Sequence, residues 1–423
     1  MDGQSYADVY AYRFLLKVDF IPDLAYNIGM DSGFGVYMKN RLISLSHDYS
    51  FFLFGARGVG KSTLIKAGFL AEHCFWIDLL LPATESRYAQ NPDLLFEEVR
   101  ALPDAITHIV IDEVQKVPKL LDVVHSLIES SRKYFILTGS SARKLKAGGA
   151  NLLAGRAFVK KLYPFSFIEL GDQFKLDQAL AMGLLPKVWD FKAPQDQCDF
   201  LEAYAYTYLK EEVWAEHLIH KLEPFRKFLE VAAQSNGKLI NYANIARDCG
   251  VDDKTIKTYF SILEDTWVGF MLEPYQHSFR KRLSQASKFY FFDLGVSRTL
   301  ARTHRIPLLP QTFAYGDCFE QFIIVEIYKL CQYFHPDYRL GFLRTKDDLE
   351  IDLVIQRPGQ PLLMIEIKST TQIDSSMLSN LKRVQKDLPD AEYCCFSNDS
   401  IPKVFDPGIA AYPWQAALRQ FFL

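Results

Sequence analysis

Long hydrophobic runs and a cysteine framework are both missing from this 423-residue sequence. No stretch reaches roughly 18 uninterrupted apolar residues, so no membrane-spanning helix is expected. The N-terminus carries Asp2, Asp8 and Arg13 among its apolar residues and therefore lacks the uncharged core of a secretory signal. The seven cysteines show neither metal-ligand spacing nor a paired disulfide pattern. We therefore expect a cytoplasmic protein with no membrane association.

The sequence also lacks an excess of charge of either sign. Its net charge is -3, with 49% hydrophobic and 23% charged residues, which is typical of soluble globular domains. A chain of this length predicts roughly two to four domains. The charge balance neither favours nor excludes a nucleic-acid partner, because a local basic groove can be averaged away over a long chain.

A phosphate-loop motif is the clearest positive signal. The segment 55–62 fits G-x-x-x-x-G-K-[ST] without a mismatch, after an apolar strand and before an expected helix. Lys61 would place its charge on the β- and γ-phosphates, and Ser62 can ligate Mg²⁺. The alternative is a glycine-rich turn with a chance lysine. The predicted nucleotide-binding residues here are Gly55, Ala56, Arg57, Gly58, Val59, Gly60, Lys61, Ser62 and Thr63.

A second apolar strand, 106–111, ends in two carboxylates and has the pattern of a Walker B element. The carboxyl ends of buried parallel strands are where ligands bind in open α/β sheets. Asp112 would hold Mg²⁺, and Glu113 would polarise the attacking water. The alternative is that both residues only cap the next helix.

A further strand, 134–138, is expected to end beside the γ-phosphate. The polar residues there that can sense this phosphate are Thr138, Ser140 and Ser141, which the sequence does not rank. Arg143 and Arg156 follow at distances from which an arginine can reach a phosphate in the same or a neighbouring subunit. Ordinary surface arginines are the alternative.

The C-terminal part carries a second set of candidate catalytic residues. Asp352 lies on an alternating strand, Glu366 and Lys368 project from one side of the next strand, and Glu320 lies on an expected helix, 313–334. Carboxylates of this kind hold Mg²⁺ for phosphodiester cleavage, and a lysine assists the nucleophile or the phosphate. We predict metal ligation by Glu320, Asp352 and Glu366 and a catalytic role for Lys368. In the alternative, the charges only pair with one another.

The middle of the chain predicts three short helices, of which 252–263 is the third, with a turn typical of a helix-turn-helix. Lys254 and Lys257 would face a duplex, or the helix serves packing alone. Residues 37–46 have helical apolar spacing. The basic residues Arg280, Lys281, Arg282 and Lys288, with Phe279, form either a nucleic-acid contact or a solvated loop.

The motifs at 55–62, 111–118, 137–143, 153–156 and 162–167 together resemble those of bacterial and archaeal AAA-type ATPases with a C-terminal domain related to PD-(D/E)xK nucleases. The resemblance implies an α/β fold in four parts. These are a P-loop parallel-sheet ATPase core at 1–170, a helical lid at 171–223, a winged-helix-like domain at 224–310 and a restriction-endonuclease-like α/β domain at 311–423.

The expected function is an ATP-binding and ATP-hydrolysing switch that forms homo-oligomers and acts on nucleic acid, with DNA the first candidate. ATP and Mg²⁺ are the expected cofactors, and the C-terminal centre would be a Mg²⁺-dependent nuclease. The alternative is a signalling or scaffolding ATPase whose nuclease-like domain is an inactive partner-binding module. A third possibility is a DNA-binding regulator that uses the helix-turn-helix alone.

Overall fold

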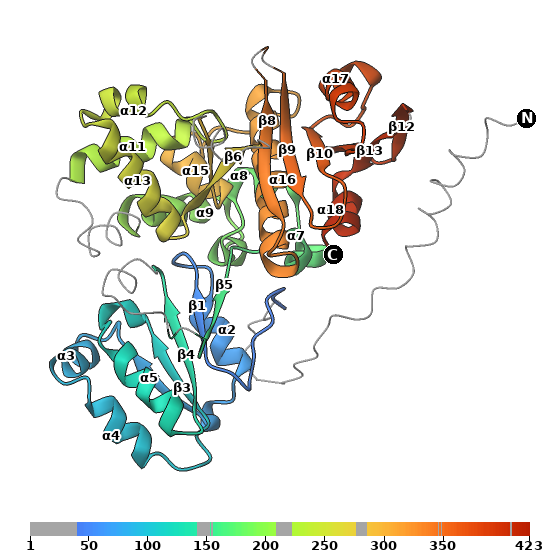
Figure 1. Cartoon of the computed structure of the whole chain (residues 1–423). Helices are drawn as coiled ribbons and strands as arrows, with labels where there is room; N and C mark the ends of the chain where they lie inside the picture. Colours follow the sequence, from blue (N-terminus) through green and yellow to red (C-terminus); the bar gives the residue numbers. More distant parts are fainter. Residues whose placement is uncertain are drawn as a thin grey trace, which may run out of the picture. The chain divides into compact units, whose positions relative to one another are not determined.

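The strands and helices in Figure 1 come from a computed structural model that describes residues 40–141, 153, 155–208, 222–275, 286–345, 347, 349–406 and 408–423. The predicted roles of Arg143 and of the cluster at 279–282 lie outside these residues. Residues 41–423 form one compact unit.

The first sheet is parallel and has the strand order β2-β3-β4-β1-β5. Its strands are β1 (Phe51–Phe54), β2 (Cys74–Asp78), β3 (His108–Asp112), β4 (Tyr134–Gly139) and β5 (Phe158–Lys161). All residues of β1 and β3 are buried, as expected for central strands covered on both faces. Because β4 lies between β1 and β3, the carboxyl ends of these three strands meet at one edge of the sheet.

Short helices connect these strands (Figure 1). Their bounds are α2 (Lys61–Gly68), α3 (Pro82–Gln90), α4 (Leu94–Ala101) and α5 (Leu120–Ser130). The helix α5 buries Leu120, Val124 and Leu127 at helical spacing against the sheet core. The strands and helices predicted between residues 51 and 139 are therefore confirmed within a few residues.

A mainly helical segment follows the first sheet. It contains α7 (Phe167–Leu170), α8 (Leu176–Met182), α9 (Pro194–Ala203), α11 (Leu222–Gln234), α12 (Tyr242–Cys249), α13 (Asp253–Asp265) and α15 (Leu294–Leu300). The last three helices begin at capping residues: Asn241, Asp252 and Asp293 each accept a hydrogen bond from a backbone amide of the first turn.

The second sheet has eight strands in the order β12-β13-β11-β10-β9-β8-β6-β7. The strands are β6 (Gly269–Pro274), β7 (Lys288–Phe291), β8 (Arg339–Arg344), β9 (Glu350–Gln356), β10 (Leu363–Lys368), β11 (Glu392–Ser397), β12 (Lys403–Asp406) and β13 (Ile409–Pro413). The helices associated with it are α16 (Phe313–Phe334), α17 (Ser379–Asp387) and α18 (Trp414–Phe422). The β6–β7 hairpin joins this sheet through β8, where Glu273 is opposite Gly341.

The helix predicted for residues 37–46 is wrong, because residues 40–46, the described part of that range, are not helical. The apolar side chains Leu42, Ile43 and Leu45 do pack against buried residues, which explains the helical-looking pattern. The backbone is irregular here because it is held by tertiary contacts, including a hydrogen bond from Leu42 N to Glu169. Among the helices of the described ranges, none combines the length and apolar content needed to cross a bilayer.

Candidate functional site

The phosphate loop has the backbone geometry that its glycines allow. Gly58 and Gly60 have φ values of 77° and 94°, which favour glycine. A Cβ at Gly55 would lie 2.2 Å from the Leu162 carbonyl oxygen, so a larger residue cannot fit there without moving β5. The helix α2 then begins at Lys61, so its free amides face the loop.

Lys61 points back into this loop. Its Nζ donates to the carbonyl oxygens of Gly55 at 2.8 Å and Ala56 at 3.3 Å, and it lies 3.9 Å from Glu113 Oε1. The side chain is only 6% exposed. The ammonium group is therefore held between the loop and the acidic end of β3, where phosphate oxygens can replace the carbonyl partners.

Ser62 and Asp112 converge as predicted. The Ser62 hydroxyl donates to Asp112 Oδ2 at 2.7 Å, and the Thr138 hydroxyl donates to the other carboxylate oxygen. A hydroxyl and a carboxylate are the hard oxygen ligands that Mg²⁺ accepts alongside water and phosphate. The chemistry of these donors therefore fits a magnesium ion beside the loop.

Glu113 is oriented by a residue that the sequence analysis did not single out. The Gln115 side-chain amide donates to Glu113 Oε2 and, at 3.1 Å, to Ser140 Oγ. Ser140 donates to the same Glu113 oxygen through its amide and hydroxyl, both at 3.3 Å. Glu113 has φ 60°, and its amide donates to Thr138. The sequence signal for Gln115 was its place in the motif at 111–118, two residues beyond Glu113.

The other predicted loop residues differ in exposure. Ala56 and Val59 are buried, whereas Arg57 and Thr63 are exposed. The Arg57 carbonyl accepts a hydrogen bond from Tyr204 at 2.9 Å. Arg156 forms an ion pair with Glu129 of α5, so its contact with nucleotide stays a prediction.

The C-terminal candidates also come together. β9 and β10 are antiparallel, with Leu353 opposite Ile365, which brings Asp352 beside Glu366. Asp352 Oδ2 accepts a hydrogen bond from the Ile367 amide at 2.7 Å, and Lys368 Nζ donates to Glu366 Oε1 at 2.7 Å. Glu366 Oε2 is buried without a hydrogen-bond partner among the described residues.

Two residues of β7 belong to this carboxylate cluster: Tyr290, which was not predicted, and Lys288, which was predicted in a different setting. Tyr290 donates to Glu320 Oε1 at 2.9 Å. Lys288 was predicted in an exposed basic cluster, but it is only 4% exposed. Its Nζ lies 2.5 Å from Glu350 Oε1 and 4.0 Å from Glu320 Oε1. That placement is wrong because β7 joins the second sheet. Lys288 and Tyr290 are two residues apart, and this spacing was the sequence signal that they lie on the same face of one strand.

Burial dominates the acid–base behaviour of the cluster. Desolvation, then repulsion from Asp352, raises the pKa of Glu320 to about 7 and that of Glu366 to about 8. Burial also raises the pKa of Asp352, against the opposing charge of Lys368. For Lys288, burial lowers the pKa, but Glu320 and Glu350 outweigh it and the net shift is upward.

The cluster is better arranged to bind magnesium through two carboxylate ligands than through the three that were predicted. No group of three or more histidine, cysteine or acidic side chains within the described ranges is placed to hold a metal ion. Glu320 is engaged by Tyr290 instead. Magnesium keeps several waters and often uses one or two carboxylates, so Asp352 and Glu366, with its unpartnered oxygen, suit it.

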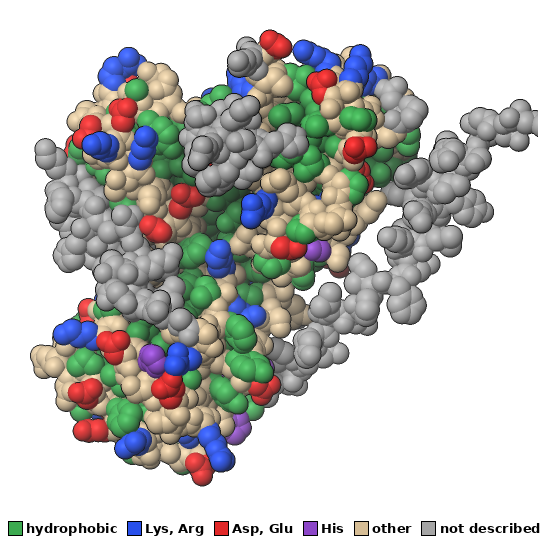
Figure 2. Space-filling model, viewed as in Figure 1, with side chains coloured by type: hydrophobic (Ala, Val, Ile, Leu, Met, Phe, Trp, Pro, Cys, Tyr) green, Lys and Arg blue, Asp and Glu red, His purple; other side chains and the backbone are tan. Residues whose placement is uncertain are grey.

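The surface has no single-sign field in the view of Figure 2, where basic and acidic side chains of the described residues are interspersed. Lys254 and Lys257 of α13 are exposed, as predicted, and Lys257 lies over the Tyr242 ring. The neighbouring Asp252 and Asp253 are exposed too, which weakens attraction to a phosphate backbone.

Three family models match consecutive parts of the chain. Residues 47–171 match an AAA domain, residues 173–305 a domain of unknown function (DUF8612) and residues 315–416 another domain of unknown function (DUF4143). The first match spans the phosphate loop and the acidic end of β3.

Relatives cover most of the chain at low identity. An uncharacterized protein of Mycobacterium tuberculosis is 27% identical over 337 residues, which are 79% of this chain and 74% of the relative. An uncharacterized protein of Methanocaldococcus jannaschii is 22% identical over 384 residues, covering 79% of this chain and 78% of the relative.

Solved structures match only weakly. The Aeropyrum pernix ORC1 protein in complex with DNA gives a TM-score of 0.27 at 12% identity, covering 60% of this chain and 86% of that one. Domain III of the Thermotoga maritima replication initiation protein DnaA gives 0.20 at 16% identity, covering 52% and 85%. The sequence motif, the site geometry and the family match together support a P-loop ATPase domain of the AAA type at residues 47–171.

Proposed function

We propose that the protein is an ATP-hydrolysing switch that uses Mg²⁺. The observation that carries this proposal is the convergence of Lys61, Ser62, Asp112 and Glu113 at one edge of the parallel sheet. Phosphoryl transfer to water requires a positive charge for the phosphates, a hydroxyl and a carboxylate that can ligate Mg²⁺, and a second carboxylate that orients the water.

The residues divide the work between binding and chemistry. Lys61 exchanges its carbonyl partners for the β- and γ-phosphate oxygens, and the amides at the start of α2 bind the same phosphates. Glu113, held by Gln115 and Ser140, orients the attacking water. Ser62 and Asp112 would hold Mg²⁺, which neutralises charge that develops on the phosphate oxygens.

Steady-state hydrolysis of ATP tests this function. Wild type should release phosphate in the presence of Mg²⁺. Lys61→Ala should reduce the rate by at least ~100-fold, because the Lys61 ammonium no longer stabilises the negative charge on the β- and γ-phosphates. Lys66→Ala, one turn later on the exposed face of α2, is the matched control and should keep the wild-type rate. Full turnover by Lys61→Ala would refute the site.

We further propose that the switch acts on nucleic acid and that its C-terminal cluster is a Mg²⁺-dependent nuclease centre. The support is the pairing of β9 with β10, which brings Asp352, Glu366 and Lys368 together. Asp352 and Glu366 would hold the metal, which activates water for attack on a phosphodiester. Lys368 is a third exposed and can turn from Glu366 to a substrate phosphate.

We also propose that the helices between the two sheets in the sequence bind nucleic acid. The helices α11–α13 followed by the β6–β7 hairpin suit a winged-helix-like domain, with Lys254 and Lys257 toward nucleic acid. Assembly into a homo-oligomer would let a neighbouring copy supply an arginine to the phosphates. Salt-sensitive binding of duplex DNA that weakens in a Lys254→Ala/Lys257→Ala variant is the expected result.

A second candidate function is a signalling or scaffolding ATPase with an inactive C-terminal domain. It is favoured by the internal pairing of the cluster, in which Lys368 bonds to Glu366 and Lys288 to Glu350. Incubation with single- and double-stranded DNA and RNA, with and without ATP and Mg²⁺ or Mn²⁺, separates the two. Cleavage that disappears in Asp352→Asn while ATP hydrolysis persists favours the nuclease, and no cleavage by wild type favours the scaffold.

A further inference from the structure

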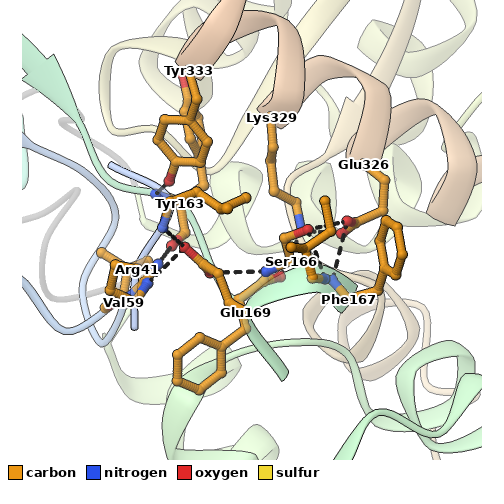
Figure 3. A network of polar contacts seen from close by, with 12 residues as sticks. Arg41, Val59, Tyr163, Ser166, Phe167, Glu169, Glu326, Lys329 and Tyr333 are labelled. Carbon is orange, nitrogen blue, oxygen red and sulfur yellow. Dashed lines mark hydrogen bonds and ion pairs between the residues drawn. The ribbon is translucent and has the colours of Figure 1, made fainter. Parts of the chain in front are cut away.

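Arg41, which precedes the matched AAA domain, is hydrogen-bonded to the backbone of the phosphate loop. Its guanidinium Nε donates to Glu169 Oε1 at 3.0 Å, Nη1 donates to the Val59 carbonyl at 2.9 Å, and Nη2 donates to the Tyr163 carbonyl. The group also lies 4.9 Å from the centre of the Phe165 ring. The side chain is 6% exposed, and each of its three nitrogens donates to a partner within the protein (Figure 3).

The bond to Val59 fixes more than one carbonyl. A trans peptide is planar, so the Val59 carbonyl and the Gly60 amide point in opposite directions. Holding that carbonyl therefore also sets the direction of the Gly60 N–H, immediately before Lys61. Arginine can hold this carbonyl and the Glu169 carboxylate together, whereas the single ammonium of lysine cannot reproduce the fork.

Glu169 connects Arg41 to the segment 163–169. Its Oε1 accepts from Arg41 and from the Leu42 amide, and its Oε2 accepts from the Ser166 amide at 3.0 Å. Ser166 and Glu169 form a capping box at the start of α7. Glu169 thus bonds Arg41 to the first turn of α7.

The same turn is bonded to a buried ion pair on α16. Ser166 Oγ donates to Glu326 Oε2 at 2.6 Å, and the Phe167 amide donates to the same oxygen at 3.2 Å. Lys329 donates to Glu326 at 2.6 Å and to the Phe165 carbonyl at 2.7 Å. Glu326 and Lys329 are 0% and 1% exposed, so leaving either partner unsatisfied would be costly.

These contacts form one stripe on α16. Glu326, Lys329 and Tyr333 are spaced by three and four residues, and the Tyr333 hydroxyl accepts from the Tyr163 amide at 3.1 Å (Figure 3). Glu320 of the carboxylate cluster lies on the same helix, six residues before Glu326, or about 9 Å along the axis. The helix α16 therefore carries Glu320 of the carboxylate cluster and also contacts segment 163–169, which is bonded to Arg41.

We propose that Arg41 is a positioning residue for the phosphate loop and that, with segment 163–169, it couples loop occupancy to α16 and its carboxylate cluster. The inference rests on the nucleotide binding proposed above. Binding of phosphates fixes the loop, the Arg41 fork follows the Val59 carbonyl, and the Ser166–Glu326 contacts carry the change to α16.

Arg41→Lys tests the positioning role in the full chain. We expect the KM for ATP to rise about 10-fold with kcat nearly unchanged, because a loop that binds ground state and transition state alike is loosened. Arg357→Lys is the matched control. Arg357 is equally buried and also bonds to a carbonyl and a carboxylate, those of Pro361 and Glu392, and its KM should stay at the wild-type value.

Hydrogen exchange tests the coupling without relying on that variant. In wild type, a non-hydrolysable ATP analogue with Mg²⁺ should change the exchange of amides in the phosphate loop and in α16. In Glu326→Leu/Lys329→Met, which replaces both buried charges by apolar groups of similar size, the loop should still respond while α16 does not. Arg41→Lys should weaken the α16 response.

The outcomes separate the coupling from the proposed function. A wild-type loop that responds to the analogue while α16 is unchanged overturns the coupling and leaves nucleotide binding intact. An unchanged KM in a folded Arg41→Lys variant overturns the positioning role. A loop that does not respond at all overturns the proposed function and this inference together.

Discussion

The two candidate sites combine the same residue types, but the chain builds them in different ways. At the phosphate loop, hydroxyls and amides hold the carboxylates: Ser62 and Thr138 bond to Asp112, and Gln115 bonds to Glu113. In the C-terminal cluster, lysines pair with Glu366 and Glu350, and Tyr290 and a backbone amide bond to Glu320 and Asp352. The first site is therefore arranged to receive a charged ligand, whereas the second first has to release internal pairs.

The largest effect that tests this contrast is expected at Glu113. Glu113→Gln removes the group that orients water but keeps the hydrogen-bonding shape, so kcat for ATP should fall by ~10²–10⁴-fold while ATP binding persists. Phosphate release and a binding titration measure the two quantities. Glu97→Gln, an exposed acid on α4, is the control. A parallel loss of binding and turnover would argue that Glu113 is structural.

The local part of this contrast was predictable from sequence. The segment 55–62 and Asp112–Glu113 were identified because each motif is contiguous and each follows an apolar strand. The hydrogen bond from Ser62 to Asp112 depends on the strand order, which was not predicted and which places β1 and β3 on either side of β4. The alternation in β9 and β10 predicted which residues share a strand face, and the antiparallel register of the two strands then brings Asp352 to Glu366.

The nonlocal partners were not predictable in the same way. Lys288 follows the basic residues 280–282 in the sequence, but it begins β7, which pairs with β6 in the second sheet, and its side chain is buried. Arg41 lies in a segment whose apolar spacing predicted a helix, whereas tertiary hydrogen bonds to Glu169 fix an irregular backbone there. In both cases the partner lies more than 60 residues away in the chain.

A smaller effect, on stability, should distinguish the two lysines of the cluster. Lys288→Met leaves Glu350 with Arg344 as its remaining partner and should cost about 2 kcal/mol of unfolding free energy, below the ~3–5 kcal/mol of a fully buried pair. Lys368→Met should cost less because Lys368 is a third exposed. Denaturant titrations measure both. A loss in Lys288→Met well below about 2 kcal/mol, or no larger than that in Lys368→Met, would contradict this ranking.

The last effect concerns pH. Glu366 binds a proton more tightly when folded, with a pKa near 8 against 4.5, so its contribution to stability is present below pH 4.5 and is lost as the pH rises to about 8. Glu366→Gln removes the titrating carboxyl group and with it this pH-dependent loss of stability. The melting temperature of the variant should therefore rise relative to wild type between pH 5 and pH 8, the interval spanned by that shift. A difference that does not vary with pH would contradict the buried protonated carboxyl.

Calorimetry of nucleotide binding tests the central claim most directly. Titration of ATP with Mg²⁺ into the full chain should give saturable binding to wild type, and Lys61→Ala should weaken it by at least ~10-fold because its ammonium no longer meets the β- and γ-phosphates. Absence of binding by wild type to any adenine or guanine nucleotide would contradict the account, as would unchanged affinity in Lys61→Ala.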